Sequence, residues 1–477
     1  MKYLSTLLLF CALSTCVRAQ TYVSVEKQDS VPRSQLTFLA GPYNVVNYKV
    51  RYRTIDTQGQ PDTASGLLTI PYDRGLEFPL GAYMHGTVTN REAVPSRMGV
   101  TERTLVDLMA SYGYVMVAPD YLGLGDNEGF HPYVHAASEA SAGRDLLLAA
   151  RQWLAEQKIP YNDQLFLTGY SQGGHAVQAL HRDIQENPGD DDLTVTAATH
   201  LSGPYSISDV MRRAAFEEEP ATLPGYIIYT YVSYDNVYGI YDNLGEVFKE
   251  PYLDVIEDFN MDVIDGTSFN NQLYQLLEDR DERLADMFQD SIRQQLEEND
   301  PDSRIIQALR DNDTYDWAPE APTLLYYCTD DEQVPFENAI LADSVMRING
   351  STTVMIESGG ERSHTECVQP ALLRTLGLFE GLASRSEVAT ATGRPVRQVS
   401  LSVSPNPVSV GGVVRVSGLT TGAYTYTLYD AAGRNVQRGT LPADGSLSVS
   451  ARAVAGLHLL RINLPDGNFA VRKVMLR

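Results

Sequence analysis

Short apolar runs alternate with amphipathic stretches from Tyr22 to about Ala383. The runs end at turn-forming residues and predict strands at Tyr43–Tyr52, Ala64–Ile70, Leu80–His85, Tyr114–Pro119, Leu165–Gly169, Val195–Ser202, Thr323–Cys328 and Thr353–Glu357. Helical spacing predicts helices at Thr101–Ser111, Ala136–Glu156, Gly173–Glu186 and Val368–Leu382. Because strands alternate with helices, we expect an α/β fold with a mostly parallel sheet covered on both faces.

One long segment, about residues 205–320, interrupts this alternation. It is longer than ordinary loops, and much of Leu253–Leu309 has amphipathic helical spacing, so we expect a helical cap inserted into the body. Residues 204–320 carry 27 acidic and 8 basic residues, a net charge of −19 that is typical of a solvated surface. Six tyrosines within residues 226–241 suit either a cap core or a platform for substrate.

The pattern changes after Ala383. Residues 384–400 are small, polar and punctuated by proline and glycine, which is the composition of a linker. Beyond them, short runs predict strands at Val408–Val416, Tyr424–Tyr429, Asn435–Thr440, Ser446–Val449, Leu457–Ile462 and Asn468–Met475. We therefore expect a catalytic-sized domain at residues 20–383, a linker and a small all-β sandwich at residues 401–477.

The first 19 residues have the organisation of an export signal. Lys2 is followed by the apolar stretch Leu4–Leu13 and then by Val17-Arg18-Ala19, which fits a cleavage site. A lipoprotein signal cut before Cys16 is the alternative, although Thr15 matches such a site poorly. No later run approaches the roughly 18 apolar residues of a membrane-spanning helix, so we expect a secreted or cell-surface protein.

Composition and charge narrow the possible partners. The 477 residues include 37 Lys and Arg against 61 Asp and Glu, a net charge of −24, whereas residues 401–477 carry +5. Because no basic stripe is available to neutralise phosphates, we expect no nucleic-acid partner. Hydrophobic residues at 43% and aromatic residues at 9% are ordinary for a globular protein, which excludes disorder for most of the chain.

The strongest chemical signal is Gly169-Tyr170-Ser171-Gln172-Gly173-Gly174. It follows a predicted strand and opens a predicted helix, which is the setting of a G-x-S-x-G nucleophile elbow. The sharp turn would present Ser171 above the sheet, and the backbone N–H of Gln172 at the helix N-terminus would hold an oxyanion. A plain turn between strand and helix is the alternative.

A serine hydroxyl needs a base that an acid holds in place, and with this motif the chain order is Ser, Asp, His. Asp331 follows the predicted strand Thr323–Cys328, and its spacing to Val334-Pro335 favours it over Asp330. His364 lies in a glycine-containing loop between the last strand and a helix, which suits a general base. The other seven histidines come too early, too near the serine, in another strand or in the tail.

A second oxyanion donor should come from the loop after the predicted strand Leu80–His85. Gly86 would let the backbone turn there, and Thr87 or Val88 would donate an N–H; a turn without a donor is the alternative. The acidic run at residues 311–316 hints at calcium. It lacks the glycine and distal glutamate of a calcium loop, so we prefer a plain turn and expect no metal or organic cofactor.

Removal of the export signal would leave Cys328 and Cys367 as the only cysteines. In an exported protein, two cysteines favour one disulfide, and two buried free thiols are the alternative. Cys328 ends the strand before Asp331 and Cys367 lies just past His364, so we expect the bond to tether the acid loop to the base loop.

Five segments of the body form a set: His85-Gly86-Thr87, Pro95-Ser96-Arg97, the run from Ala118 to Gly125, His131-Pro132-Tyr133 and the elbow. Together they resemble the α/β-hydrolase superfamily and, within it, the secreted (LIP-type) lipase family, over about residues 36–383. The resemblance implies carboxylic-ester hydrolysis by a triad of Ser171, Asp331 and His364. The cap has no matching segment, so substrate choice does not carry over.

Four segments of the tail form a second set: Ser404-Pro405-Asn406-Pro407, the run from Leu428 to Arg434, the run from Ala455 to Arg461, and Arg472-Lys473-Val474. They are similar to the C-terminal sorting domain of the type IX secretion system. This resemblance implies the secretion machinery as a partner, passage across the outer membrane and frequent removal of the tail. A generic β-sandwich binding module is the alternative.

These observations predict a secreted serine hydrolase that cleaves a small-molecule or lipid ester through an acyl-enzyme. Two alternatives remain on the same fold. One is a serine peptidase, because the triad does not distinguish esters from amides. The other is a surface binding protein without catalysis. No motif fixes the acyl chain, the alcohol or the oligomeric state.

Overall fold

The computed structural model describes residues 20–36, 39–73, 75–189, 191–216, 223–387, 401–419, 424–430, 434–451, 453–463 and 469–477. The expected export signal and most of the expected linker lie outside these residues. The chain divides into two compact units, Met1–Val388 and Ala389–Arg477. Among the described helices, none is long and apolar enough to span a membrane.

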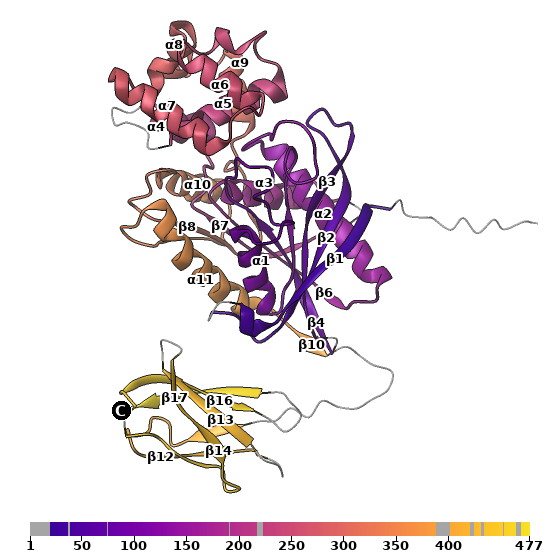
Figure 1. Cartoon of the computed structure of the whole chain (residues 1–477), viewed down its shortest axis with the longest axis vertical. Coiled ribbons are helices and arrows are strands. Elements are labelled where there is room, and N and C mark those ends of the chain that lie inside the picture. Colours follow the sequence, from indigo (N-terminus) through magenta and orange to yellow (C-terminus); the bar gives the residue numbers. More distant parts are fainter. Residues whose placement is uncertain are drawn as a thin grey trace, which may run out of the picture. The chain divides into compact units, whose positions relative to one another are not determined.

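A sheet of ten strands runs through the first unit (Figure 1). Its strands are β1 (Tyr22–Val31), β2 (Val45–Ile55), β3 (Pro61–Pro71), β4 (Leu76–Met84), β5 (Val115–Pro119), β6 (Tyr161–Tyr170), β7 (Val195–Leu201), β8 (Thr323–Tyr327), β9 (Val354–Ser358) and β10 (Ser386–Glu387). The helices around the sheet are η1 (Arg33–Gln35), α1 (Thr101–Ser111), α2 (Ala136–Glu156), α3 (Gln172–Glu186), α10 (Glu337–Ile348) and α11 (His364–Leu382).

The strand order is β1-β2-β3-β5-β4-β6-β7-β8-β9, and β10 pairs with the start of β4. From β5 to β9 all neighbouring strands are parallel, whereas β1, β2, β3 and β5 pair in antiparallel fashion. The mostly parallel sheet confirms the predicted α/β fold. Because the carboxyl ends of parallel strands meet at one end of a sheet, the loops after β4, β6, β8 and β9 can gather their side chains there.

Helices cover both faces of this sheet, as the pattern predicts (Figure 1). Leu165 and Leu167 of β6 belong to the core shared with α2 and α3. Phe166 between them belongs to the opposite core, which α1 and α11 complete. Side chains that alternate in this way are expected of a strand buried on both faces.

Two elements of the structure, β1 and α10, are not predicted by the hydrophobic pattern. β1 contains polar residues at most positions, because it is an edge strand that pairs only with β2 within the described sheet. α10 buries one side, which includes Asn338, Ala339 and Ala342, so its apolar stripe is weak. α11 begins at His364 rather than Val368, because the Ser363 hydroxyl caps the helix there.

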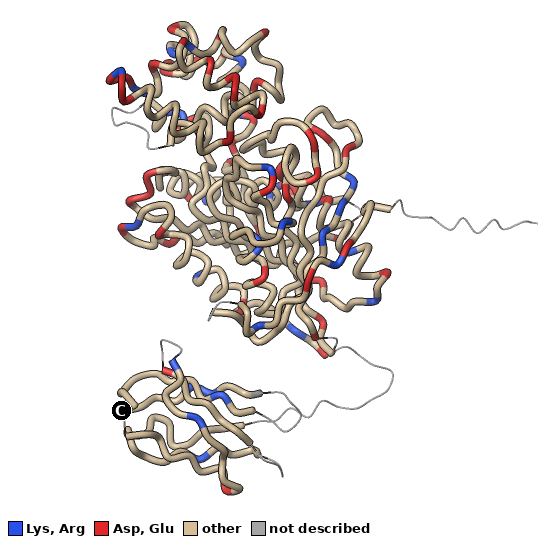
Figure 2. The backbone as a smooth tube through the Cα atoms, in the orientation of Figure 1, with Lys and Arg blue, Asp and Glu red and all other residues tan. Residues whose placement is uncertain are grey.

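The cap follows β7 and is helical, as expected. It contains the π-helical turn η2 (Ile207–Met211), α4 (Arg212–Ala214), α5 (Pro224–Tyr238), η3 (Leu244–Glu246), α6 (Tyr252–Asn260), α7 (Gly266–Arg280), η4 (Leu284–Met287), α8 (Asp290–Glu298) and α9 (Arg304–Asp311). Tyr229, Tyr231 and Tyr234 are buried in a core of its own. Acidic residues occur along most of the described cap (Figure 2).

A short segment after α9 ties the end of the cap to the body. The side-chain oxygen of Asn312 accepts a hydrogen bond of 2.8 Å from the N–H of Ala136, at the start of α2. The carboxylate of Asp313 accepts the N–H and the hydroxyl of Ser208 in η2, at 3.0 and 2.5 Å. The acidic run that hints at calcium therefore contributes hydrogen bonds at both ends of the cap.

The second unit is an all-β sandwich of two small antiparallel sheets. One contains β11 (Ser402–Ser404), β12 (Val413–Ser417) and β15 (Ser446–Ser448), and the other contains β14 (Asn435–Leu441), β13 (Tyr424–Asp430), β16 (Gly456–Asn463) and β17 (Phe469–Leu476). The two sheets share one apolar core. The predicted strand Val408–Val416 begins only at Val413, because the chain turns at Gly411, whose φ is 78°.

We predict that Asp313 makes stability depend on pH. Burial raises the pKa of its carboxyl to about 6, above the value of about 3.9 expected in the unfolded chain. Asp313 therefore stabilises the fold most below pH 4, and this contribution is lost as the pH rises through 6, by at most about 3 kcal/mol.

The test compares the melting temperatures of the wild type and Asp313→Asn between pH 4 and pH 7. The asparagine does not titrate, so the melting temperature of the variant should rise relative to that of the wild type as the pH rises. Other titrating groups are shared by both proteins and cancel in the difference. A difference that stays constant across this range would contradict the prediction.

Candidate active site

Ser171 stands at the turn between β6 and α3, with φ of 61° and ψ of −124°. This is a strained conformation for a residue with a side chain, and such strain concentrates at functional sites. The turn is possible because its neighbours are glycines. A Cβ on Gly169 would lie 2.1 Å from the carbonyl oxygen of Gly173, and a Cβ on Gly173 would lie 2.0 Å from that of Met84.

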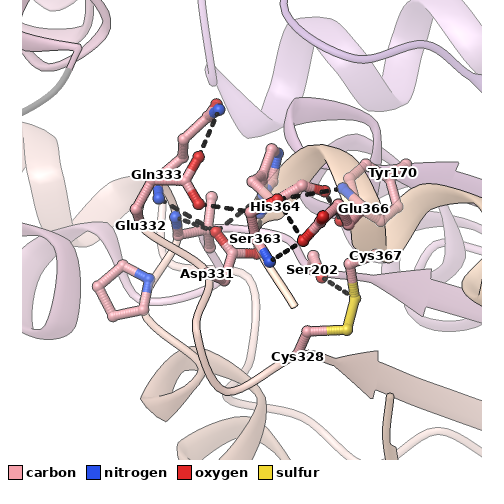
Figure 3. Close-up of polar contacts among 12 residues, drawn as sticks. Tyr170, Ser202, Cys328, Asp331, Glu332, Gln333, Ser363, His364, Glu366 and Cys367 are labelled. Carbon is pink, nitrogen blue, oxygen red and sulfur yellow. Dashed lines mark hydrogen bonds and ion pairs between the residues drawn. A yellow bond between two sulfur atoms is a disulfide. The ribbon is translucent and has the colours of Figure 1, made fainter. Parts of the chain in front are cut away.

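Asp331 and His364 meet across the ends of β8 and β9 (Figure 3). The His364 Nδ1 atom lies 2.7 and 2.9 Å from the two Asp331 carboxylate oxygens. The Asp331 side chain is 2% exposed and the His364 side chain 7%, so the pair is shielded from water. One Asp331 oxygen also accepts the backbone N–H of Val334, at 2.8 Å. The neighbouring Asp330 is exposed.

The backbone of His364 is held on both sides (Figure 3). Its N–H donates to the Glu332 carboxylate at 3.0 Å, and its carbonyl accepts the Tyr170 hydroxyl at 2.6 Å. Ser363 and Glu366 form a capping box at the same helix start. Since Nδ1 faces the acid, the remaining ring nitrogen, Nε2, is the atom that can accept a proton.

A disulfide joins the segment that precedes Asp331 to the helix that begins at His364. Cys328, directly after β8, and Cys367, in the first turn of α11, have an S–S distance of 2.02 Å and a Cα separation of 6.1 Å. Both cysteines are fully buried. The bond therefore fixes the start of α11, and with it His364, relative to the strand that precedes Asp331 (Figure 3).

The loop after β4 lies against the nucleophile. A Cβ on Gly86 would come within 3.8 Å of the Ser171 Cβ. The His85 ring is buried and holds this loop, because its Nδ1 lies 2.8 Å from the Gly86 carbonyl oxygen. The Thr87 hydroxyl hydrogen-bonds to the Tyr133 hydroxyl at 2.8 Å and lines a cavity, whereas the Val88 side chain packs against the core.

That cavity has a volume of about 610 Å³ and lies between the cap and the body. Ser171, Gln172 and Asp331 of the body are among its lining residues, and most of the lining residues from the cap are apolar or tyrosine: Ile207, Val210, Met211, Ala214, Leu223, Tyr226, Ile227, Tyr231 and Leu309. In the described part of the chain no hydrogen bond joins the Ser171 hydroxyl to the His364 ring. Such bonds are often long until substrate is bound.

A buried polar cluster that the sequence does not predict surrounds the side chain of Gln172, the residue after Ser171. The Gln172 side chain contacts Glu139 and His131, each at 2.9 Å, and Glu139 also contacts His175 at 2.7 Å. Burial lowers the pKa of His131 to about 3, so its ring is neutral. No spacing rule points to Glu139, which lies in an unremarkable first turn of a helix.

Proteins similar to this chain were found among solved structures, but not by comparison with family models or curated sequences. No family model and no curated protein matches the chain. LipA from Xanthomonas oryzae, described as a rice cell wall degrading esterase, has a TM-score of 0.67 at 28% identity, over 76% of this chain and 98% of that chain. A hydrolase from Legionella pneumophila has a TM-score of 0.68 with the same identity and coverage.

Candida antarctica lipase A in its closed state has a TM-score of 0.56 at 15% identity, over 76% of this chain and 82% of that chain, which shows the fold alone. The sheet, the elbow and these similarities define an α/β-hydrolase fold with a helical cap. Within that fold, this chain is similar to proteins described as an esterase, a hydrolase and a lipase.

We predict that breaking the disulfide lowers both stability and activity. The bond closes a loop with a sequence separation of 39, for which chain entropy gives about 3–4 kcal/mol. Replacing Cys328 and Cys367 together by alanine should lower the melting temperature and also kcat, because α11 carries the base. Reductant should lower the activity of the wild type and leave that of the variant unchanged.

Counting thiols in the denatured, unreduced protein provides the control for this experiment. The mature chain should show no free thiol from Cys328 or Cys367. Two free thiols would contradict the bond, and equal melting temperatures for the wild type and the double variant would contradict its role in stability.

Proposed function

We propose that the protein is a serine hydrolase that cleaves carboxylic esters through an acyl-enzyme. The observation that carries the proposal is the shielded Asp331–His364 pair beside a cavity that is also lined by the strained Ser171. The similarity to structures described as an esterase and a hydrolase, each at 28% identity, supports the choice of reaction.

In the proposed mechanism, His364 Nε2 takes the Ser171 proton while Asp331 holds Nδ1 and stabilises the imidazolium. The serine oxygen attacks the ester carbonyl, and the oxyanion forms beside the N–H of Gln172 at the start of α3. The second donor is the N–H of Thr87 or Val88. His364 then gives its proton to the leaving alcohol, and water repeats these steps on the acyl-enzyme.

The cavity favours an ester with a substantial apolar part. Its cap wall is built mainly from aliphatic and tyrosine side chains, and apolar walls with a few polar groups at one end are typical of small-molecule sites. Ser171 and Gln172 of the body would hold the reacting atoms, so the apolar group of a small-molecule or lipid ester would lie against the cap. Four further charged residues are part of the lining: Arg212, Arg213, Glu332 and Glu337.

The proposal is tested with p-nitrophenyl esters of increasing acyl length and with aminoacyl anilides. Esters should be hydrolysed and anilides should not. Preferential anilide cleavage would favour a serine peptidase, and a protein that cleaves neither would favour a binding protein.

We predict that Ser171→Ala abolishes ester hydrolysis without unfolding the protein. Loss of a triad residue costs about 10⁴–10⁶ in kcat in related chemistry. Asp331→Asn should be far more damaging than Asp330→Asn, because Asp331 hydrogen-bonds to the His364 ring whereas Asp330 is exposed. The neighbouring substitution is the matched control, with the same change of charge one residue away. Equal losses, or an active and folded Ser171→Ala protein, would contradict the mechanism.

Export is part of the proposed function. The signal-like first 19 residues and the sorting-domain motifs of the tail support secretion, with the secretion machinery as the partner of the tail. The description of LipA as a cell wall degrading esterase is consistent with a role outside the cell. The sandwich has its own core, so the tail can act as a separate module.

We predict that a chain ending at Val388 stays folded and active in a host without this secretion system, but accumulates in the periplasm of the native host. A chain ending at Ala383 is the matched control, because it also removes β10 and the hydrogen bond from the Ser384 N–H to Gln164. This shorter chain should have a lower melting temperature. Normal secretion of the Val388 chain would show that the tail is a binding module instead.

A further inference from the structure

The side chain of Gln172 has a fixed place beside the nucleophile. Gln172 opens α3, and the first N–H groups of a helix have no partner within the helix. Its side chain is buried, and its Nε2 atom lies 2.9 Å from both the Glu139 carboxylate and His131 Nε2. Its Oε1 atom is also buried and has no hydrogen-bond partner among the described residues. Both anchors of the side chain are therefore on its amino group.

The orientation of this amide follows from its neighbours. His131 Nδ1 lies 2.8 Å from the Leu122 carbonyl oxygen and must donate to it, so in the neutral ring Nε2 is an acceptor. The Glu139 carboxylate is an acceptor as well. If the Gln172 amide were reversed, its oxygen would face two acceptors, so each hydrogen of its amino group is used in the observed orientation.

Glu139 reaches two positions in the first turn of α3. One carboxylate oxygen accepts from Gln172, and the other lies 2.7 Å from Nδ1 of His175. The second ring nitrogen of His175 lies 2.8 Å from the Asn312 carbonyl oxygen, at the end of the cap. Because that carbonyl can only accept, this ring nitrogen donates to it, and a hydrogen must also lie between Glu139 and His175 Nδ1.

We propose that Glu139 is a positioning residue for the oxyanion hole. Through its bond to the Gln172 side chain and its bond to His175, it fixes the start of α3 and with it the Gln172 N–H. This inference rests on the proposed ester hydrolysis and extends it to a residue that does not touch the substrate. Because His175 also contacts the Asn312 carbonyl, the same contacts connect the end of the cap to the oxyanion hole.

Geometry rather than charge should decide the effect of substitutions at this position. Glu139→Gln keeps the length of the side chain: its carbonyl oxygen can accept from Gln172, and its amino group can donate to Nδ1 of a neutral His175. Glu139→Asp keeps the charge but is one methylene shorter, so its carboxylate cannot reach both partners at the observed distances.

The experiment measures kcat and KM for a p-nitrophenyl ester, together with the melting temperature of each protein. Glu139→Asp should lower kcat by about 10–100-fold, the cost of a small misplacement of catalytic groups. KM should stay within about threefold, because the oxyanion interaction is made in the transition state. Glu139→Gln should retain kcat within about threefold of the wild type.

Gln178→Asn is the matched control. Gln178 is also fully buried in α3 and joins the body to the end of the cap, because it accepts from the Thr314 hydroxyl at 2.7 Å. Among the described residues it forms no hydrogen bond with Ser171 or Glu139, and its amide nitrogen lies 3.1 Å from His200 Nδ1. Shortening it by one methylene should lower the melting temperature and leave kcat unchanged.

A boronic acid that adds to the serine as a tetrahedral adduct gives a second readout. Its affinity should fall with Glu139→Asp in parallel with kcat. If Glu139→Asp does not fold, Gln172→Asn replaces it, because the shorter amide withdraws from Glu139 and should lower kcat to a similar extent. The inference would be overturned if the variant that folds, Glu139→Asp or Gln172→Asn, had the kcat of the wild type. It would also be overturned if Glu139→Gln and Glu139→Asp lost kcat to the same extent.

The control could also overturn the inference. If Gln178→Asn lowered kcat as much as Glu139→Asp does, the effect of Glu139 would be one of general packing. The proposed function fails in a different way. A folded wild type that neither hydrolyses esters nor binds the boronic acid would overturn both proposals. An active wild type with an unaffected Glu139→Asp variant would overturn only this one.

Discussion

Ser171 has a positive φ of 61° because β6 must pass into α3 within a single residue. At this turn the helix start, the end of β6 and the loop after β4 approach so closely that a Cβ on Gly169 or Gly173 would clash with neighbouring backbone. The same contacts place the first N–H groups of α3 beside the serine, where the helix dipole favours a negative charge. The elbow thus fixes Ser171 and the N–H of Gln172 together, which the proposed mechanism uses as nucleophile and oxyanion donor.

The rest of the site depends on strands that are neighbours in the sheet but distant in sequence. β8 and β9 are parallel partners, and their ends bring Asp331 and His364 within hydrogen-bonding distance. The long cap lies between β7 and β8, yet its two ends return to the same place, where Asp313 and Ser208 are hydrogen-bonded. The cap therefore covers the nucleophile without disturbing the sheet, and its apolar wall shapes the space in which an ester would bind.

The sheet, most of its helices and the cap follow from the sequence because their signals are local: apolar runs, helical spacing and a motif set between a strand and a helix. β1 is missed because an edge strand needs few apolar residues, and the strand at Val413 starts late because a glycine turn precedes it. Ser171, Asp331 and His364 can be ranked as candidates from chain order. Glu139 cannot, because its contacts with Gln172 and His175 arise only when two helices pack together.

The central claim is that His364 and Asp331 activate Ser171. Fluorophosphonate labelling with peptide mapping tests it most directly, because the reagent reports an activated serine whatever the natural substrate. We predict a single adduct on the peptide that contains Ser171, formed at least about 100-fold more slowly in His364→Ala. An adduct at another residue, no adduct in the folded wild type, or an unchanged rate in His364→Ala would contradict the account.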